Sequence, residues 1–258
     1  MFHNPNDRLS FAATTTLADE GWRSCGLWAI DATNPNTFDA ARRKILRHSK
    51  ANAVIMQETR LKSSDEIAAA KRAAKREGWS AHFEPARHTA ADRGSGGCGV
   101  AVKKGSGISA VSTSDLDPEA KHRIAAAWVD VVIKGGITII SVYMADSEGL
   151  SERNMAVLQE ATALVRSLRS PWIMAGDWNM EPSTLNSAGW VDTTGGVVVA
   201  PALVTCNSST YHFFVASREL QHAVVGLQRI EDGGTKPHFP VRLLLRGNGR
   251  RYAVRKLV

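Results

Sequence analysis

The sequence predicts one α/β domain in which two β-sheets pack face to face and helices cover the outside. Three observations support this architecture. The chain opens with alternating strand-like and helix-like segments, and short strands then follow one another over residues 99–143. Each half also contains a packed helix and a loop that carries a carboxylate at the end of a strand. A chain of 258 residues can form one large core of this kind.

The first half of the chain predicts a strand–helix–strand–helix–strand order. Phe38, Ala41 and Ile45 recur at helical spacing after an Asn-Pro-Asn turn, and a later Ala-rich segment ends at Gly78. The expected elements are a strand at 25–30, a helix from Thr37, a strand at 53–56, a helix from Ser63 or Ser64 to Glu77, and a strand at 79–83.

The second half is expected to consist mainly of strands around one long helix. After a loop at 85–97, a meander is predicted, with its clearest hairpin turn at Lys134-Gly135-Gly136. Its strands are expected at 99–102, 108–112, 124–133 and 137–143. A helix at 151–168 and a buried strand at 171–175 follow, and further strands are predicted at 197–199, 211–216, 223–227 and 241–245.

The two ends of the chain are expected to differ from this domain, which spans residues 22–246. Residues 1–21 lack clean periodicity and predict a flexible leader. From Arg242 to Val258 the chain has six basic residues and no acidic one, namely Arg242, Arg246, Arg250, Arg251, Arg255 and Lys256, and residues 247–258 are predicted to form a basic tail. Such concentrated charge can follow a phosphate backbone, although a frayed, solvated tail has the same composition.

The composition narrows the class of protein. The chain is 43% hydrophobic and 22% charged, which excludes disorder throughout. Its formal charge of +7 fits a polyanionic partner, although basic proteins often carry only a solvated surface. Three widely separated cysteines favour reduced thiols, and no apolar run reaches the length of a membrane span. We therefore expect an intracellular protein of the cytoplasm or nucleus with no membrane partner.

Two carboxylates stand where strands end. Glu58 directly follows the apolar strand 53–56, and Asp177 lies in the tetrapeptide Gly176-Asp177-Trp178-Asn179 after the strand 171–175. Carboxylates at strand ends can anchor a metal ion or act as a base, and Asn179 can hydrogen-bond a neighbouring oxygen. Each motif alone is also compatible with a solvated glutamate or a plain turn.

Several further motifs occur in a characteristic order with these two. They are Trp28-Ala29-Ile30-Asp31, Gln57-Glu58-Thr59-Arg60, residues 97–102, Arg123, Ser141-Val142-Tyr143, Arg153, Gly176-Asp177-Trp178-Asn179, residues 213–217 and Pro237-His238-Phe239-Pro240-Val241. This order, over residues 22–246, resembles the endonuclease/exonuclease/phosphatase (DNase I-like) superfamily. It is most similar to the apurinic-type endonuclease domains of non-LTR retrotransposons. The resemblance implies a four-layer α/β sandwich that cuts DNA with a divalent metal.

The resemblance also implies roles for individual residues. Glu58 and Asp31 would hold Mg²⁺ or Mn²⁺, for which oxygen ligands are suited. Asp177 would activate the attacking water, Asn179 would position it or the phosphate, and Tyr143 and His238 would contact the phosphate. Arg123 and Arg153 would contact the DNA backbone, although either could be an ordinary surface cation.

Three positions depart from the family pattern. Ala29 replaces an asparagine, so one amide hydrogen bond is missing unless Asn34 reaches in from the turn. His212 and Pro237 stand where the family has aspartates, which removes the carboxylate expected to orient His238. His212 is therefore an uncertain neighbour of the site, and an impaired enzyme is consistent with these changes.

Together these features predict a Mg²⁺-dependent endonuclease that nicks DNA and derives from a retroelement, whose chain could continue into a reverse transcriptase region. The alternative is a catalytically weakened or inactive nucleic-acid-binding remnant of the same fold, which the changes at 29, 212 and 237 favour. A small-molecule phosphatase has no supporting motif beyond the shared core.

Overall fold

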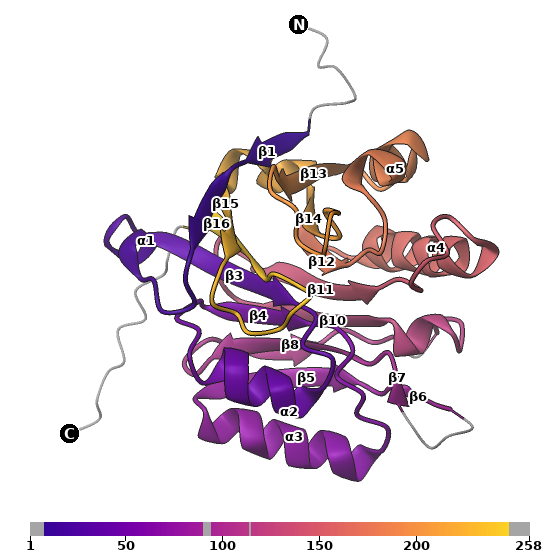
Figure 1. Ribbon diagram of the computed structural model, residues 1–258, viewed down its shortest axis with the longest axis horizontal. Coiled ribbons are helices and arrows are strands. Elements are labelled where there is room, and N and C mark those ends of the chain that lie inside the picture. The colour runs from indigo at the N-terminus through magenta and orange to yellow at the C-terminus, as the bar shows by residue number, and fades with distance from the viewer. Residues whose placement is uncertain (1–7, 90–93, 114, 248–258) are drawn as a thin grey trace, which may run out of the picture.

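Two seven-stranded sheets form the centre of the computed structural model, which describes residues 8–89, 94–113 and 115–247 (Figure 1). Sheet I has the order β1 (Leu9–Phe11), β13 (Gly196–Pro201), β14 (His212–Ser217), β12 (Trp172–Asp177), β11 (Ile137–Tyr143), β10 (Ile124–Val129) and β9 (Ile108–Ala110). Sheet II has the order β2 (Ala13–Thr15), β15 (Val224–Ile230), β16 (Val241–Arg246), β3 (Leu27–Thr33), β4 (Ala53–Met56), β8 (Cys98–Lys103) and β5 (Trp79–Glu84). β6 (Arg87–His88) and β7 (Gly94–Ser95) pair separately.

The helices lie on the outer faces of the sheets (Figure 1). Sheet II is covered by α2 (Phe38–Ala40), its π-helical continuation η1 (Ala41–Leu46) and α3 (Ser64–Arg76), and sheet I by α4 (Glu152–Ser167), α5 (Pro182–Ser187) and α6 (Trp190–Thr193). The remaining helices are α1 (Gly21–Ser24), η2 (Ala120–His122) and η3 (Arg218–Ala223). No helix in the described ranges is long and apolar enough to cross a membrane.

Alternation along the strands explains why the sheets face each other. Ile30 and Ile55 of sheet II pack with Ile139 and Ile173 of sheet I in one buried cluster between the sheets. Because neighbouring side chains on a strand point to opposite faces, the intervening residues pack against the helices. The predicted two-sheet α/β sandwich is therefore confirmed.

The predicted flexible leader is wrong for the part that the structure describes. β1 pairs in parallel with β13 at the edge of sheet I, and β2 pairs in parallel with β15 at the edge of sheet II. Edge strands offer unpaired backbone groups, which bind a short segment regardless of its hydrophobic period. Residues 1–7 lie outside the described ranges, as do 248–258 of the predicted basic tail.

The predicted meander is also corrected. β8 belongs to sheet II between β4 and β5, whereas β9, β10 and β11 are consecutive in sheet I. The strand expected at 124–133 ends at Val129, and Val132 adopts a positive φ of 69° that a regular strand does not allow. The chain therefore passes from sheet II to sheet I after β8. The hydrophobic pattern of each strand does not show to which sheet it belongs, because this depends on packing between the two sheets.

Candidate active site

The carboxyl ends of parallel strands from both sheets meet at one edge of the sandwich. β3 and β4 are parallel in sheet II, and Asn34 and Glu58 lie just beyond their ends. β11 and β12 are parallel in sheet I and end at Tyr143 and Asp177. The Asn34 amide joins the two groups, because its Nδ2 donates at 2.9 Å to both Glu58 Oε2 and Asp177 Oδ2. Asn34 therefore does reach in from the turn.

Below this edge, buried polar contacts hold the two sheets in register. Gln57 is fully buried, and its Nε2 donates at 3.2 Å to Ser141 Oγ on the opposite sheet. The Ser141 hydroxyl in turn donates at 2.9 Å to the Met56 carbonyl. These bonds fix the spacing between Glu58 and Asp177, which lie on different sheets.

The backbone aims these side chains by means of left-handed conformations. Glu58 and Asn179 both have a φ of 48°, which costs energy for residues other than glycine. Asn179 is held by donation from its Nδ2 to the Met144 carbonyl at 2.9 Å. Asp177 precedes it, and the turn places both side chains at the end of β12.

The two carboxylates have different surroundings. Asp177 is fully buried, and burial raises its pKa, with the charge of His238 and the hydrogen bond from Asn34 acting in the opposite direction. Glu58 is partly accessible, and its Oε1 contacts Arg60 Nη2 at 3.3 Å. A raised pKa makes a carboxylate a better proton acceptor, which suits Asp177 to the role of a base.

Tyr143 lies beside the two carboxylates. Burial, followed by the charges of Glu58 and Asp177, raises its pKa above the usual value for a phenol. The phenol is therefore protonated at neutral pH and can donate a hydrogen bond to an anionic ligand.

A pair of histidines completes the site. His212 starts β14 directly opposite Asp177, and its Nε2 lies 2.9 Å from Nδ1 of His238, which lies in the loop before β16. His238 Nδ1 is also 3.6 Å from Asp177 Oδ2. Burial and the neighbouring His238 hold the pKa of His212 well below 6.5, so His212 is neutral. Because Nδ1 faces His212, Nε2 is the nitrogen of His238 that remains for a ligand.

Asp31 does not join this group, contrary to the expectation that it completes the metal environment. Its carboxylate pairs with Arg242, with Nε to Oδ1 at 2.7 Å and Nη2 to Oδ2 at 3.0 Å, and it accepts from Ser49 Oγ at 2.6 Å. The reason is strand alternation, because Ile30 and Ala32 face the inter-sheet core and Asp31 faces the other side. Arg242 is fully buried in this pair, so it is not part of a phosphate-tracking tail.

The two arginines expected to contact DNA share one acidic partner. Arg123 Nε donates to Glu119 Oε1 at 3.1 Å, and Arg153 contacts the same carboxylate. The Arg123 side chain is only 5% exposed and its guanidinium lies over the Tyr143 ring, at 5.3 Å from the centroid. The Arg123 side chain therefore packs against the Tyr143 ring, whereas the Arg153 side chain is more accessible to solvent. The sequence analysis assigned no role to Arg60, whose guanidinium contacts the Glu58 carboxylate at 3.3 Å.

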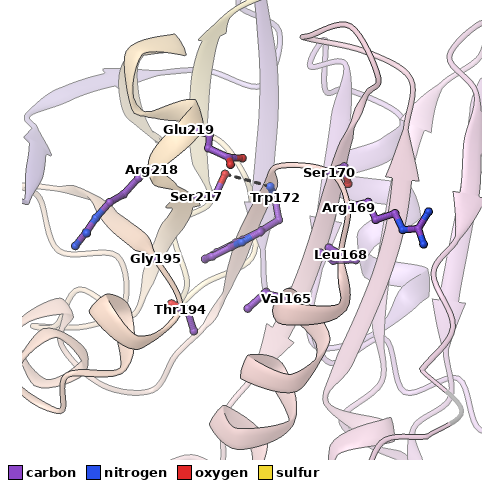
Figure 2. A pocket seen from close by; sticks show the side chains of 10 residues that line it. All are labelled: Val165, Leu168, Arg169, Ser170, Trp172, Thr194, Gly195, Ser217, Arg218 and Glu219. Carbon is purple, nitrogen blue, oxygen red and sulfur yellow. Dashed lines mark hydrogen bonds between the residues drawn. The ribbon is translucent and has the colours of Figure 1, made fainter.

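A cavity of about 360 Å³ lies at the other end of sheet I and shares no residue with this site (Figure 2). It adjoins Trp172, the first residue of β12, whereas Asp177 is the last. Arg218 on its rim pairs with Asp192 at 2.5 Å, and Arg169 points away from the cavity (Figure 2). The cavity thus has no group aimed into it comparable with the cluster at Asp177.

Several solved structures share the fold of this chain. The AP endonuclease LMAP from Leishmania major has a TM-score of 0.69 and 17% identity, with 94% of each chain covered. An AP endonuclease from Archaeoglobus fulgidus has a TM-score of 0.63 and 16% identity, covering 84% of this chain and 99% of that one. The endonuclease domain of TRAS1, a telomere-specific non-LTR retrotransposon, has a TM-score of 0.59 and 13% identity, covering 85% and 98%.

At these identities the solved structures show the DNase I-like fold. No curated protein sequence gave a significant match. A family model does match, over residues 32–235, which include Asn34, Glu58, Tyr143, Asp177 and His212. The strand-end carboxylates, the sandwich that joins them and this match together show that the chain belongs to the Endonuclease/Exonuclease/phosphatase family.

Proposed function

We propose that this protein is a divalent-metal-dependent endonuclease that hydrolyses a phosphodiester bond in DNA. The observation that carries the proposal is the cluster in which Asn34 joins Glu58 to Asp177, with His238 at 3.6 Å from Asp177. It combines an oxygen-rich cation site, a buried base and an imidazole, which are the groups that phosphodiester hydrolysis requires.

The residues present fit a hard cation such as Mg²⁺ or Mn²⁺. Asp177 Oδ1 is buried and has no hydrogen-bond partner in the described part of the chain, so the site holds negative charge that its own donors leave unbalanced. Glu58, with Asp177 nearby, would hold the ion, which would neutralise charge on the phosphate. Asp31 is excluded from this role by its pairing with Arg242.

The remaining groups have distinct tasks in hydrolysis. Asp177 accepts a proton from the attacking water, and its Asn34 contact keeps the carboxylate oriented. The Tyr143 phenol and His238 Nε2 donate to oxygens of the phosphate, where charge increases as the bond to the leaving oxygen breaks. A retroelement origin, with a reverse transcriptase region elsewhere in the chain, is the finer form of the proposal and is supported by the fold shared with TRAS1.

A plasmid assay tests the function. Supercoiled DNA should be nicked with Mg²⁺ and left intact with EDTA, and Asp177→Asn should lower the rate by about 10²- to 10⁴-fold because the general base is lost. Glu58→Gln should remove the response to Mg²⁺, while Glu219→Gln, at an exposed glutamate far from the site, should nick normally. Equal rates in Glu58→Gln and the parent protein would refute the metal assignment.

The second candidate function is a nucleic-acid-binding remnant that has lost turnover. The observation that favours it is His212, because its imidazole lies 2.9 Å from His238 Nδ1, nearer than the Asp177 carboxylate at 3.6 Å. A folded protein that binds DNA but nicks none with Mg²⁺ or Mn²⁺ would establish this alternative.

A further inference from the structure

A group of basic side chains lies at the end of sheet II opposite the proposed hydrolytic site, where α1 is found (Figure 1). The group consists of Arg23, Lys50, Lys103, Lys104 and Arg246, and we call it the distal basic surface. Arg246 ends β16, Arg23 and Lys50 precede β3 and β4, and Lys103 ends β8. These four strands are neighbours in sheet II, so the cations follow one edge of the sheet.

Strand alternation places the cations at the strand ends on the outer face of sheet II. Lys103 follows Val102, which packs in the core between the sheets, and Arg246 follows Leu245 of the same core. Successive side chains on a strand point to opposite faces, so Lys103 and Arg246 lie on the outer side. There the Lys103 Nζ lies 3.8 Å from the centroid of the Trp79 ring.

The surface carries more positive than negative charge. Glu20 pairs with Arg23 Nη1 at 2.7 Å and with Lys50 Nζ at 3.5 Å, whereas the other three cations have no ion pair with a carboxylate among the described residues. Burial, and after it the charges of Arg23 and Lys50, lowers the pKa of Lys103 to about 8, so the cations act on one another across the surface. An anionic partner would relieve this repulsion.

Two of the cations are held in place before any partner binds. The Arg23 guanidinium lies over the Trp22 ring, and its Nη2 donates to the Lys50 carbonyl at 2.6 Å. The Trp79 ring next to Lys103 is itself fixed, because its Nε1 donates to a backbone carbonyl at 2.7 Å. Side chains that are already ordered lose less conformational entropy on binding, which distinguishes this surface from scattered, solvated lysines.

The dimensions of the surface favour the backbone of a DNA duplex. The strands from β16 to β8 span about 14 Å at a spacing of about 4.8 Å, and one strand of a duplex carries about four phosphates over that length. Trp22 and Trp79 are buried, so neither ring can stack on an unpaired base as in a site for single strands.

The distal basic surface and the hydrolytic site lie at opposite ends of the same strands. β3 runs from Leu27 to Thr33, which separates its two ends by about 20 Å. DNA is stiff over about 150 base pairs, so a duplex that lies across the site does not bend round to the other end of the sheet. A partner at the distal basic surface is therefore a different segment from the one in the site.

We propose that the distal basic surface binds the phosphate backbone of a second DNA duplex segment, so that the protein bridges two segments and cuts one of them. Only the bridging rests on the proposed function, since binding at this surface does not need nuclease activity.

Lysine acetylation of the full chain locates the bound DNA. A short duplex, added in EDTA so that no strand is cut, should protect Lys103 and Lys104 from acetic anhydride, as measured by mass spectrometry of the digested protein. Lys71, exposed on α3, is the control in the same sample and should react equally with and without DNA. Unchanged acetylation of Lys103 and Lys104 at saturating duplex would overturn the proposal.

A double variant tests the contribution of the charges. Lys104 and Arg246 are exposed and make no side-chain hydrogen bond among the described residues, so Lys104→Gln/Arg246→Gln should unfold at the parental temperature. Its duplex affinity, measured by fluorescence anisotropy, should depend less on salt, with a log–log slope smaller by up to about 1.8 for two lost phosphate contacts.

Arg166→Gln/Arg169→Gln is the matched control for this variant. It removes the same charge at two exposed arginines at the end of α4, on the side of sheet I, and should keep the parental salt slope. Equal slopes in the two double variants would overturn the proposal. So would binding to phosphatidylserine vesicles, but not to the duplex, that depends on Lys104 and Arg246.

Capture of a labelled duplex on an immobilised one measures bridging and separates it from the proposed function. The parent protein should capture the labelled duplex and Lys104→Gln/Arg246→Gln should not, while both should nick a single short duplex in Mg²⁺ at the same rate. Loss of nicking in this variant would place the surface in the path of the substrate and overturn the proposal. Protection of Lys103 and Lys104 without any nicking would refute the nuclease and leave the surface supported, whereas protection without capture would overturn the bridging.

Discussion

Replacement of Asp31 distinguishes a structural ion pair from a metal ligand. Asp31 and Arg242 are both fully buried, and two hydrogen bonds of 2.7 and 3.0 Å join them. Arg242 also donates to the carbonyls of Thr16, Leu17 and Asp19, which ties the segment after β2 to sheet II. The pair therefore stabilises the fold at a position that the family resemblance assigned to the metal.

The size of the expected loss in stability follows from the burial of Asp31 and Arg242. Removal of one partner leaves an uncompensated charge inside the protein, which typically costs about 3–5 kcal/mol. Asp31→Asn should therefore lower the free energy of unfolding by about 3–5 kcal/mol, a large share of the 5–15 kcal/mol typical of a domain. Arg242→Met should cost at least as much, because three carbonyls also lose their donor.

Urea unfolding followed by tryptophan fluorescence measures both variants and the double variant. The double variant should be less destabilised than the sum of the single ones, because the two sites share one interaction. Asp192→Asn is the control, since its pair with Arg218 is about half exposed and should contribute less than about 1 kcal/mol. A loss below 1 kcal/mol in Asp31→Asn, or a weakened Mg²⁺ response in nicking by the folded variant, would refute this reasoning.

Three other predictions concern the basic tail, Lys103 at the end of β8 and the buried Asn154 of α4. Deletion of 248–258 should leave the melting temperature unchanged and weaken DNA binding for all sequences alike. The slope of the logarithm of the binding constant against the logarithm of salt concentration should become smaller by about 0.9 per lost phosphate contact, and an unchanged slope would show the tail to be merely solvated. Burial, then Arg23 and Lys50, lowers the pKa of Lys103 to about 8. Between pH 8 and 10.5 the unfolded chain therefore binds more protons at Lys103 than the folded protein does, so the free energy of unfolding should increase as pH rises through this window. Urea unfolding at pH 8 and at pH 10.5 measures this increase, and the contribution of Lys103 to it should be absent in Lys103→Met. Asn154 accepts from the Ala145 amide at 2.7 Å and donates to its carbonyl at 3.1 Å, so Asn154→Ala should destabilise by about 1–3 kcal/mol in the same assay; an unchanged midpoint would show that water replaces these bonds.

Local pattern alone was enough to predict most elements of this protein. The strand at 53–56, the helix that Ser63 caps and the helix that Ser151 caps are confirmed, because hydrophobic period and capping side chains act over a few residues. The positions of Glu58 and Asp177 at strand ends were also visible in the sequence, since an apolar run that stops at a carboxylate needs no tertiary information.

The tertiary structure decided which side chains meet. Asp31 and Asn34 are three residues apart, yet Asp31 faces Arg242 from a distant strand while Asn34 lies between Glu58 and Asp177. Strand alternation sets the face, but only the pairing of β3 with β16 supplies the buried arginine, and only the packing of sheet I on sheet II brings Asp177 to Asn34. Local sequence determined where most of the longer elements lie, whereas the edge strands β1 and β2 and the contacts that build the site depend on long-range packing between segments that the sequence does not place side by side.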